Sequence, residues 1–220
     1  MKKLFKTLSI TLLMSVTFLA TSCSKKNNNG PDVPPPTPDG VQKVEYIDAS
    51  SYEKWTYFSF ATGKVVEVSD PKSSMDWDVA FHRGEIRVNG PQNFSGKAGV
   101  FMTEGTDFNA TIDTKTIDFK ANVEALLQVE HGMKAAQEKR QPKTEKQFYV
   151  FVGEKVNSYT FFAYNKNSQM GDVKNMYPIN NKIFIFKGAD GKSVYKLQIK
   201  GSIDAEGRKS GFLSFIYQKI

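Results

Sequence analysis

The sequence has little cysteine and little histidine. Cys23 is the single cysteine, and His82 and His131 are the two histidines. One cysteine cannot form a disulfide within the chain, so other interactions must hold the fold. No Cys-x-x-Cys pair and no His-x-x-x-His pair is present, which excludes the common ligand spacings of zinc sites.

Known catalytic signatures are also missing. The chain has no Gly-rich phosphate loop followed by Lys and no Gly-x-Ser-x-Gly turn. The formal net charge is +7, but the basic residues do not form a stripe with interleaved aromatic residues. Nucleic acid is therefore not an expected partner. We expect a binding protein rather than an enzyme.

The N-terminal hydrophobic run is too short to predict a transmembrane helix, which needs about 20 apolar residues. A basic start, an apolar stretch from Leu8 to Ala20 and small residues before Cys23 instead predict a signal peptide over residues 1–22. The residues before Cys23 resemble the lipobox of bacterial lipoproteins. We expect cleavage before Cys23 and lipidation of its thiol, which would anchor the chain to a membrane.

Residues 23–41 contain five of the nine prolines and a run of asparagines, with no apolar period. Such a segment cannot bury enough apolar surface to fold, so we expect a flexible tether that follows the lipidated Cys23. The remaining residues, 42–220, are long enough for one domain with its own core.

Short β-prone runs recur along this domain, separated by turn residues. The expected strands are 55–60, 64–68, 77–81, 85–88, 148–152, 158–164, 182–186, 194–199 and 212–217. Turns are expected at residues 62–64 and 188–191. Only residues 119–129 look helical, with Gly132 as the stop signal. The pattern predicts a mostly β fold, a single antiparallel domain with one or two short helices.

Two blocks of the sequence resemble the HmuY family of haem-binding lipoproteins from Bacteroidota. The first runs from Ile47 to Phe60, continues through Gly63–Val68 and ends with Asp-Trp-Asp-Val-Ala-Phe-His-Arg at residues 76–83. The second block is residues 177–191. The resemblance covers about residues 43–90 and 170–217, and the middle of the chain, roughly residues 91–150, diverges.

The resemblance implies an HmuY-like β domain that binds haem b through two axial side-chain ligands. Matching the second block places one ligand at Met170, with Met176 as the alternative. The other ligand falls in the diverged segment, where Met133 is favoured because it would pair with Met170, and where His131 is the alternative. His82 is expected to be structural, because it belongs to the first block.

The same resemblance suggests further residues that could contact the haem. Aromatic side chains near Met170 in the sequence could stack on the porphyrin, namely Phe161, Phe162, Tyr164 and Tyr177. Three lysines could meet the haem propionates, namely Lys134, Lys166 and Lys174.

The family implies a haemophore that is lipid-anchored to the outer membrane, either displayed on the cell surface or released from it. Its expected partners are a TonB-dependent haem receptor and host haemoproteins as the haem source. Two alternatives without haem remain open at this point, a tethered module that binds glycan or protein and a structural envelope lipoprotein.

Overall fold

The computed structural model describes residues 40–152, 167 and 178–220. The predicted signal peptide, Cys23, the tether up to residue 39 and the predicted strand 158–164 lie outside these residues. None of the helices in the described part of the chain has the length and apolarity needed to cross a membrane.

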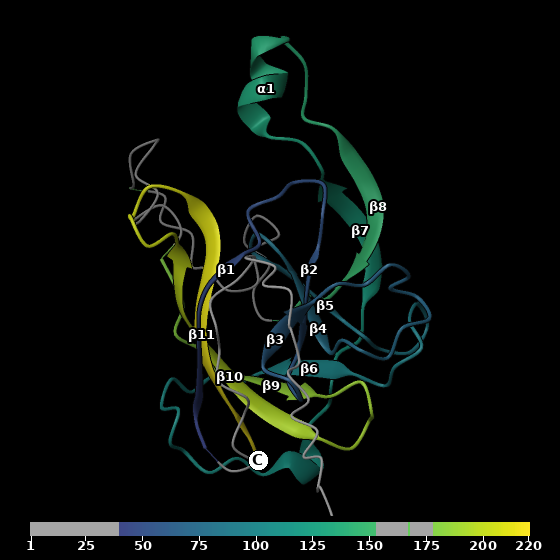
Figure 1. The fold of residues 1–220 in the computed structure, drawn as a ribbon, viewed down its shortest axis with the longest axis vertical. Coiled ribbons are helices and arrows are strands. Elements are labelled where there is room, and N and C mark those ends of the chain that lie inside the picture. Colours follow the sequence, from purple (N-terminus) through teal and green to yellow (C-terminus); the bar gives the residue numbers. More distant parts are fainter. Residues whose placement is uncertain (1–39, 153–166, 168–177) are drawn as a thin grey trace, which may run out of the picture.

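The described residues form antiparallel sheets and two short helical segments (Figure 1). The strands are β1 (Gln42–Asp48), β2 (Thr56–Ser59), β3 (Lys64–Val66), β4 (Val79–His82), β5 (Glu85–Val88), β6 (Gly99–Met102), β7 (Val123–Gln128), β8 (Thr144–Tyr149), β9 (Phe184–Lys187), β10 (Val194–Ile203) and β11 (Ser210–Lys219). The helical segments are the 3₁₀ turn η1 (Thr114–Thr116) and the α-helix α1 (Gly132–Gln137).

Three sheets are built from these strands. Five strands pair in the order β1-β11-β10-β9-β6, and four pair in the order β3-β2-β4-β5. The third sheet is the two-stranded hairpin β7-β8. The mostly β, antiparallel architecture with one short α-helix is therefore confirmed.

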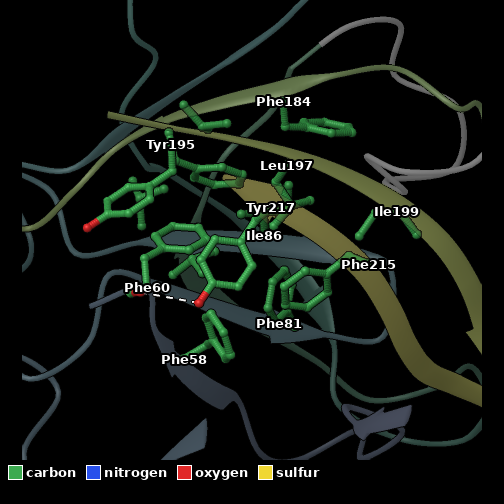
Figure 2. Packing of buried hydrophobic residues seen from close by; sticks show 14 of the residues in the cluster. Phe58, Phe60, Phe81, Ile86, Phe184, Tyr195, Leu197, Ile199, Phe215 and Tyr217 are labelled. Carbon is green, nitrogen blue, oxygen red and sulfur yellow. Dashed lines mark hydrogen bonds between the residues drawn. The ribbon is translucent and has the colours of Figure 1, made fainter. Parts of the chain in front are cut away.

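The two larger sheets face each other across one aromatic core (Figure 2). Along β11 the residues alternate, so that Leu213, Phe215 and Tyr217 are buried while the residues between them are partly exposed. Phe58 and Phe81 of the four-stranded sheet meet Phe215 with ring centroids 5.3 and 5.7 Å apart. This alternation is the period of a half-buried strand and explains why β11 was predictable.

Both predicted turns are present. Gly63 connects β2 to β3 with a φ of 67°, and Gly191 lies between β9 and β10 with a φ of 71°. These left-handed conformations favour glycine because a Cβ atom would be strained there.

The helix predicted over residues 119–129 is wrong, because this segment contains strand β7, which pairs in register with β8. Leu127 is buried while Leu126 is 62% exposed, so the two leucines point to opposite faces. The spacing of the apolar residues is compatible with one face of a helix, but the hydrogen-bonded pairing with β8 makes the segment a strand. Gly132 does not stop a helix but begins α1.

The hairpin β7-β8 and α1 form a projection that we call the arm, residues 123–149. Figure 1 shows α1 at the end of the arm that lies away from the two larger sheets. The root of the arm is its junction with β5, and the tip is residues 129–143 with α1.

We expect Phe215→Ala to lower the free energy of unfolding by about 3–5 kcal/mol, because a fully buried ring would leave a cavity between the two sheets. Chemical denaturation measures this loss. The matched control is Val65→Ala on the edge strand β3, where the side chain is 46% exposed and the change should stay within about 0.5 kcal/mol. Equal losses in both variants would contradict the packing described above.

Candidate functional site

The arm contains two of the four predicted ligand residues. Met133 and His131 are described, whereas Met170 and Met176 lie outside the described residues. The same holds for the aromatic residues predicted near Met170 and for two of the predicted lysines, namely Phe161, Phe162, Tyr164, Tyr177, Lys166 and Lys174. The geometry reported below is therefore that of the arm.

Met133 presents its thioether to solvent. Its side chain is 67% exposed in the first turn of α1, where Ala135 is the one buried residue. Two further large apolar side chains of the arm are exposed, Leu126 by 62% and Val123 by 49%. An exposed methionine at the end of a projecting hairpin contributes little to the core, so a contact outside the domain is the role that its position suits.

His131 caps the helix that carries Met133. Its Nδ1 atom accepts a hydrogen bond from the Met133 backbone N–H at 3.1 Å. A ring nitrogen that accepts must be unprotonated, so the neutral imidazole carries its proton on Nε2. In this state Nε2 has no lone pair free for a metal.

A clasp of charged groups closes the tip. The Arg140 guanidinium donates to both carboxylate oxygens of Glu130 at 2.6 and 2.7 Å, and the Lys143 backbone N–H donates to the same carboxylate at 3.1 Å. The hydrogen bonds from Arg140 are the main cause that lowers the pKa of Glu130 to about 2. The same pairing raises the pKa of Arg140. The clasp links the two ends of the segment that contains α1.

The root of the arm is bound to three consecutive residues of β5. The Val150 N–H donates to the Ile86 carbonyl at 2.8 Å. The Asn122 side chain bonds both backbone groups of Val88, at 3.0 and 2.8 Å. Between these two ties, the Arg87 Nε–H donates to the Phe148 carbonyl at 2.8 Å.

Arg87 itself is buried against aromatic rings. Its guanidinium lies 3.9 Å from the Trp55 ring centroid and donates to the Gln147 side-chain oxygen at 2.6 Å. Burial lowers the pKa of Arg87 to about 10, so it stays charged at neutral pH. The Trp55 ring and the oxygens of Gln147 and Phe148 compensate for part of the lost hydration.

His82 lies in the interior, 2% exposed, away from any open surface. Its Nε2 atom donates to the Tyr52 carbonyl at 2.9 Å, and its Nδ1 lies 3.2 Å from a Glu85 carboxylate oxygen. Both ring nitrogens are thus engaged within the fold. Among the described residues, no group of three or more His, Cys, Asp and Glu side chains is arranged to hold a metal ion.

The residues that hold the arm against the domain are not apparent from the sequence. Tyr52 and Trp55 lie in the first block of family resemblance, but nothing in their local pattern indicates contact with the arm. The His131 ring lies 5.2 Å from the Tyr52 ring, and the Trp55 Nε1–H donates to Gln147 at 3.0 Å. Gln147 lies 92 positions after Trp55 in the sequence, so only the fold reveals their contact.

The clasp should open in acid before the core does. The pKa of Glu130 is lowered from an ordinary value of 4.5 to about 2, so its stabilisation is complete above pH 4.5 and is lost as pH falls toward 2. We expect the Met133 methyl and amide NMR signals to shift over this interval.

The variant Glu130→Gln should remove that acid-induced shift, while Glu206→Gln, at an exposed pair with Arg208, should keep it. The two variants are compared over the pH range in which the NMR signals of the aromatic core remain those of the folded protein. Met133 signals that stay constant down to pH 2 in the parent chain would contradict the clasp.

A family model described as HmuY protein matches residues 51–217. No curated protein matches. The solved structures with similar folds include three bacterial proteins.

A protein of Bacteroides vulgatus, described as HmuY-like and heme-binding, has a TM-score of 0.60 at 22% identity and covers 84% of this chain and 96% of its own. The apo HmuY analogue of Tannerella forsythia has a TM-score of 0.58 at 22% identity, with 86% and 98% covered. Apo PinO of Porphyromonas gingivitis has a TM-score of 0.60 at 20% identity, with 82% and 97% covered. At these identities the structures support the fold, and the family model covers most of the chain. The chain belongs to the HmuY family.

Proposed function

We propose that this protein binds haem b through two methionine ligands, Met133 on the arm and Met170. The observation that carries the proposal is the exposed Met133 thioether on a helix whose start is capped and whose ends are clasped. Haem iron accepts thioether sulfur as an axial ligand. Membership of the HmuY family and the heme-binding description of a structural relative support haem as the molecule that is bound.

The hydrogen bond of His131 favours Met133 over His131 as the ligand. Coordination through His131 Nε2 would require the proton to move to Nδ1, where it would oppose the Met133 N–H. The histidine would then lose its capping bond at the start of α1. Within the described part of the chain the Met133 side chain makes no hydrogen bond, so its sulfur can bind a metal without breaking one.

Lys134 is the predicted propionate partner that the structure describes. Its side chain is 67% exposed and follows Met133 in α1, with Nζ 3.6 Å from a Glu130 carboxylate oxygen. Two carboxylates on the haem would suit a cation at this place. Thioether is a soft, neutral ligand, so we expect the reduced haem to bind more tightly than the oxidised haem.

We further propose a haemophore role in which Cys23 is lipidated and holds the domain at the outer membrane. The chain would then deliver haem to a TonB-dependent receptor after taking it from host haemoproteins. Membrane fractionation of the parent chain and of Cys23→Ser tests the anchor. Release of the parent into the soluble fraction would contradict it.

We expect a saturable low-spin haem spectrum when the full chain is titrated with haem in detergent, sharper after reduction by dithionite. Met133→Ala and Met170→Ala should each weaken binding by at least about tenfold, since even outer-shell partners of metal ligands act on that scale. Absorbance in the Soret and visible bands measures the effect. The matched control is Met75→Ala, an exposed methionine in the loop before β4, which should bind as the parent does.

Two variants of His131 distinguish a role as haem ligand from a role as helix cap. His131→Asn retains a side chain that can cap a helix, so we expect nearly full haem binding. His131→Ala should weaken binding modestly, by about fivefold, because the cap is lost. Complete loss of the low-spin spectrum in His131→Asn would make His131 the ligand. No saturable spectrum in the parent would overturn haem binding and favour a tethered module for glycan or protein.

A further inference from the structure

The loop that connects β1 to β2, residues 49–55, touches the arm at two separate levels. Tyr52 meets His131 at the tip, where the ring centroids are 5.2 Å apart and the planes are inclined by 77°. Trp55 meets Gln147 in β8, through the hydrogen bond of 3.0 Å. Two contacts at different distances from the root resist rotation of the arm, whereas one contact would allow a pivot.

A positively charged guanidinium supports each of the two aromatic rings. Arg83 lies 4.3 Å from the Tyr52 ring centroid, and Arg87 lies 3.9 Å from that of Trp55. Arg83 is fixed in turn, since it donates to the Ser50 carbonyl and to the Ser210 hydroxyl at 2.8 Å each. Its backbone has a φ of 54°, a left-handed conformation that costs energy in a residue with a side chain.

The backbone of Tyr52 is also held from inside the domain. The buried His82 donates to the Tyr52 carbonyl, and Glu85 holds the other side of the imidazole. A shift of Tyr52 would leave buried polar groups without partners, which is costly. The loop is therefore a firm support, anchored to β4 and β5.

The arm needs such a support because it is a two-stranded hairpin, which is marginally stable by itself. Its strands have six residues each, so they reach about 20 Å from the root. A small rotation at the root would displace the tip by several times as much. The hydrogen bonds to β5 fix the root but do not reach α1.

We propose that loop 49–55 braces the arm, and that Tyr52 and Trp55 are positioning residues for Met133. The inference rests on the proposed function, because it gives the brace a task at the haem ligand. A braced arm spends more of its time in the binding geometry, and apparent affinity rises in proportion to that fraction. Neither residue needs to touch haem for this effect.

The experiment compares Tyr52→Leu with Tyr52→Phe, which keeps the ring and serves as the matched control. The arm is measured without haem, by double electron–electron resonance between spin labels at Gln137→Cys in α1 and Lys192→Cys in the turn after β9. The full chain carries Cys23→Ser, so the introduced thiols are the only ones. We expect a broader distance distribution in Tyr52→Leu and the parent distribution in Tyr52→Phe.

Haem titration of the same variants gives the second readout. Tyr52→Leu should bind haem about fivefold more weakly, the scale of one aromatic pair, with the ligand spectrum of the parent. Tyr52→Phe should bind as the parent does. Gln147→Leu leaves the loop sequence unchanged but removes the oxygen that accepts from both Trp55 and Arg87, and it should also broaden the distribution.

The outcomes separate the brace from the proposed function. An unchanged distance distribution in Tyr52→Leu would overturn the brace, whether or not haem binds. A broadened distribution with unchanged haem affinity would overturn the positioning role. A parent chain that binds no haem would overturn the proposed function, while the distance measurement would still decide whether loop 49–55 holds the arm.

Discussion

Three consecutive residues of β5 hold both strands of the arm, and the position of the arm depends on them. Ile86 and Val88 bond the arm through their backbone groups, and Arg87 bonds it through its side chain. The edge strand is thereby covered, which removes unpaired donors and acceptors from the surface. Ile86 and Val88 also pack in the aromatic core with no exposed surface, so the root of the arm is attached directly to core residues.

The tip is held in another way, by local contacts. The Glu130–Arg140 clasp and the His131 cap fix the shape of the segment around α1, whereas its direction in space depends on Tyr52. Shape and direction are therefore set by separate interactions. That division suits a proposed ligand, Met133, which must be presented in one orientation while remaining exposed to an incoming molecule.

Much of the fold was predictable, because hydrophobic alternation and turn glycines are local signals. Strand β5 was predicted at its observed bounds, residues 85–88. The error at residues 119–129 arose because β7 depends on a partner strand that lies beyond a tip of about 15 residues, and local spacing does not reveal it. For the site, the resemblance indicated Met133 and Met170 as ligands. The clasp and the support from Tyr52 required the three-dimensional contacts.

NMR of methyl-labelled methionines in the reduced complex tests most directly whether Met133 is an axial ligand of haem. The chain has seven methionines, and each methyl signal can be assigned by substitution. A methyl group bound beside the haem iron is shifted strongly upfield by the ring current, whereas more distant methyl groups are not. We expect this shift for the Met133 and Met170 methyl signals in the haem complex and no such shift for Met75. A Met133 signal that keeps its haem-free position in the saturated complex would contradict the account.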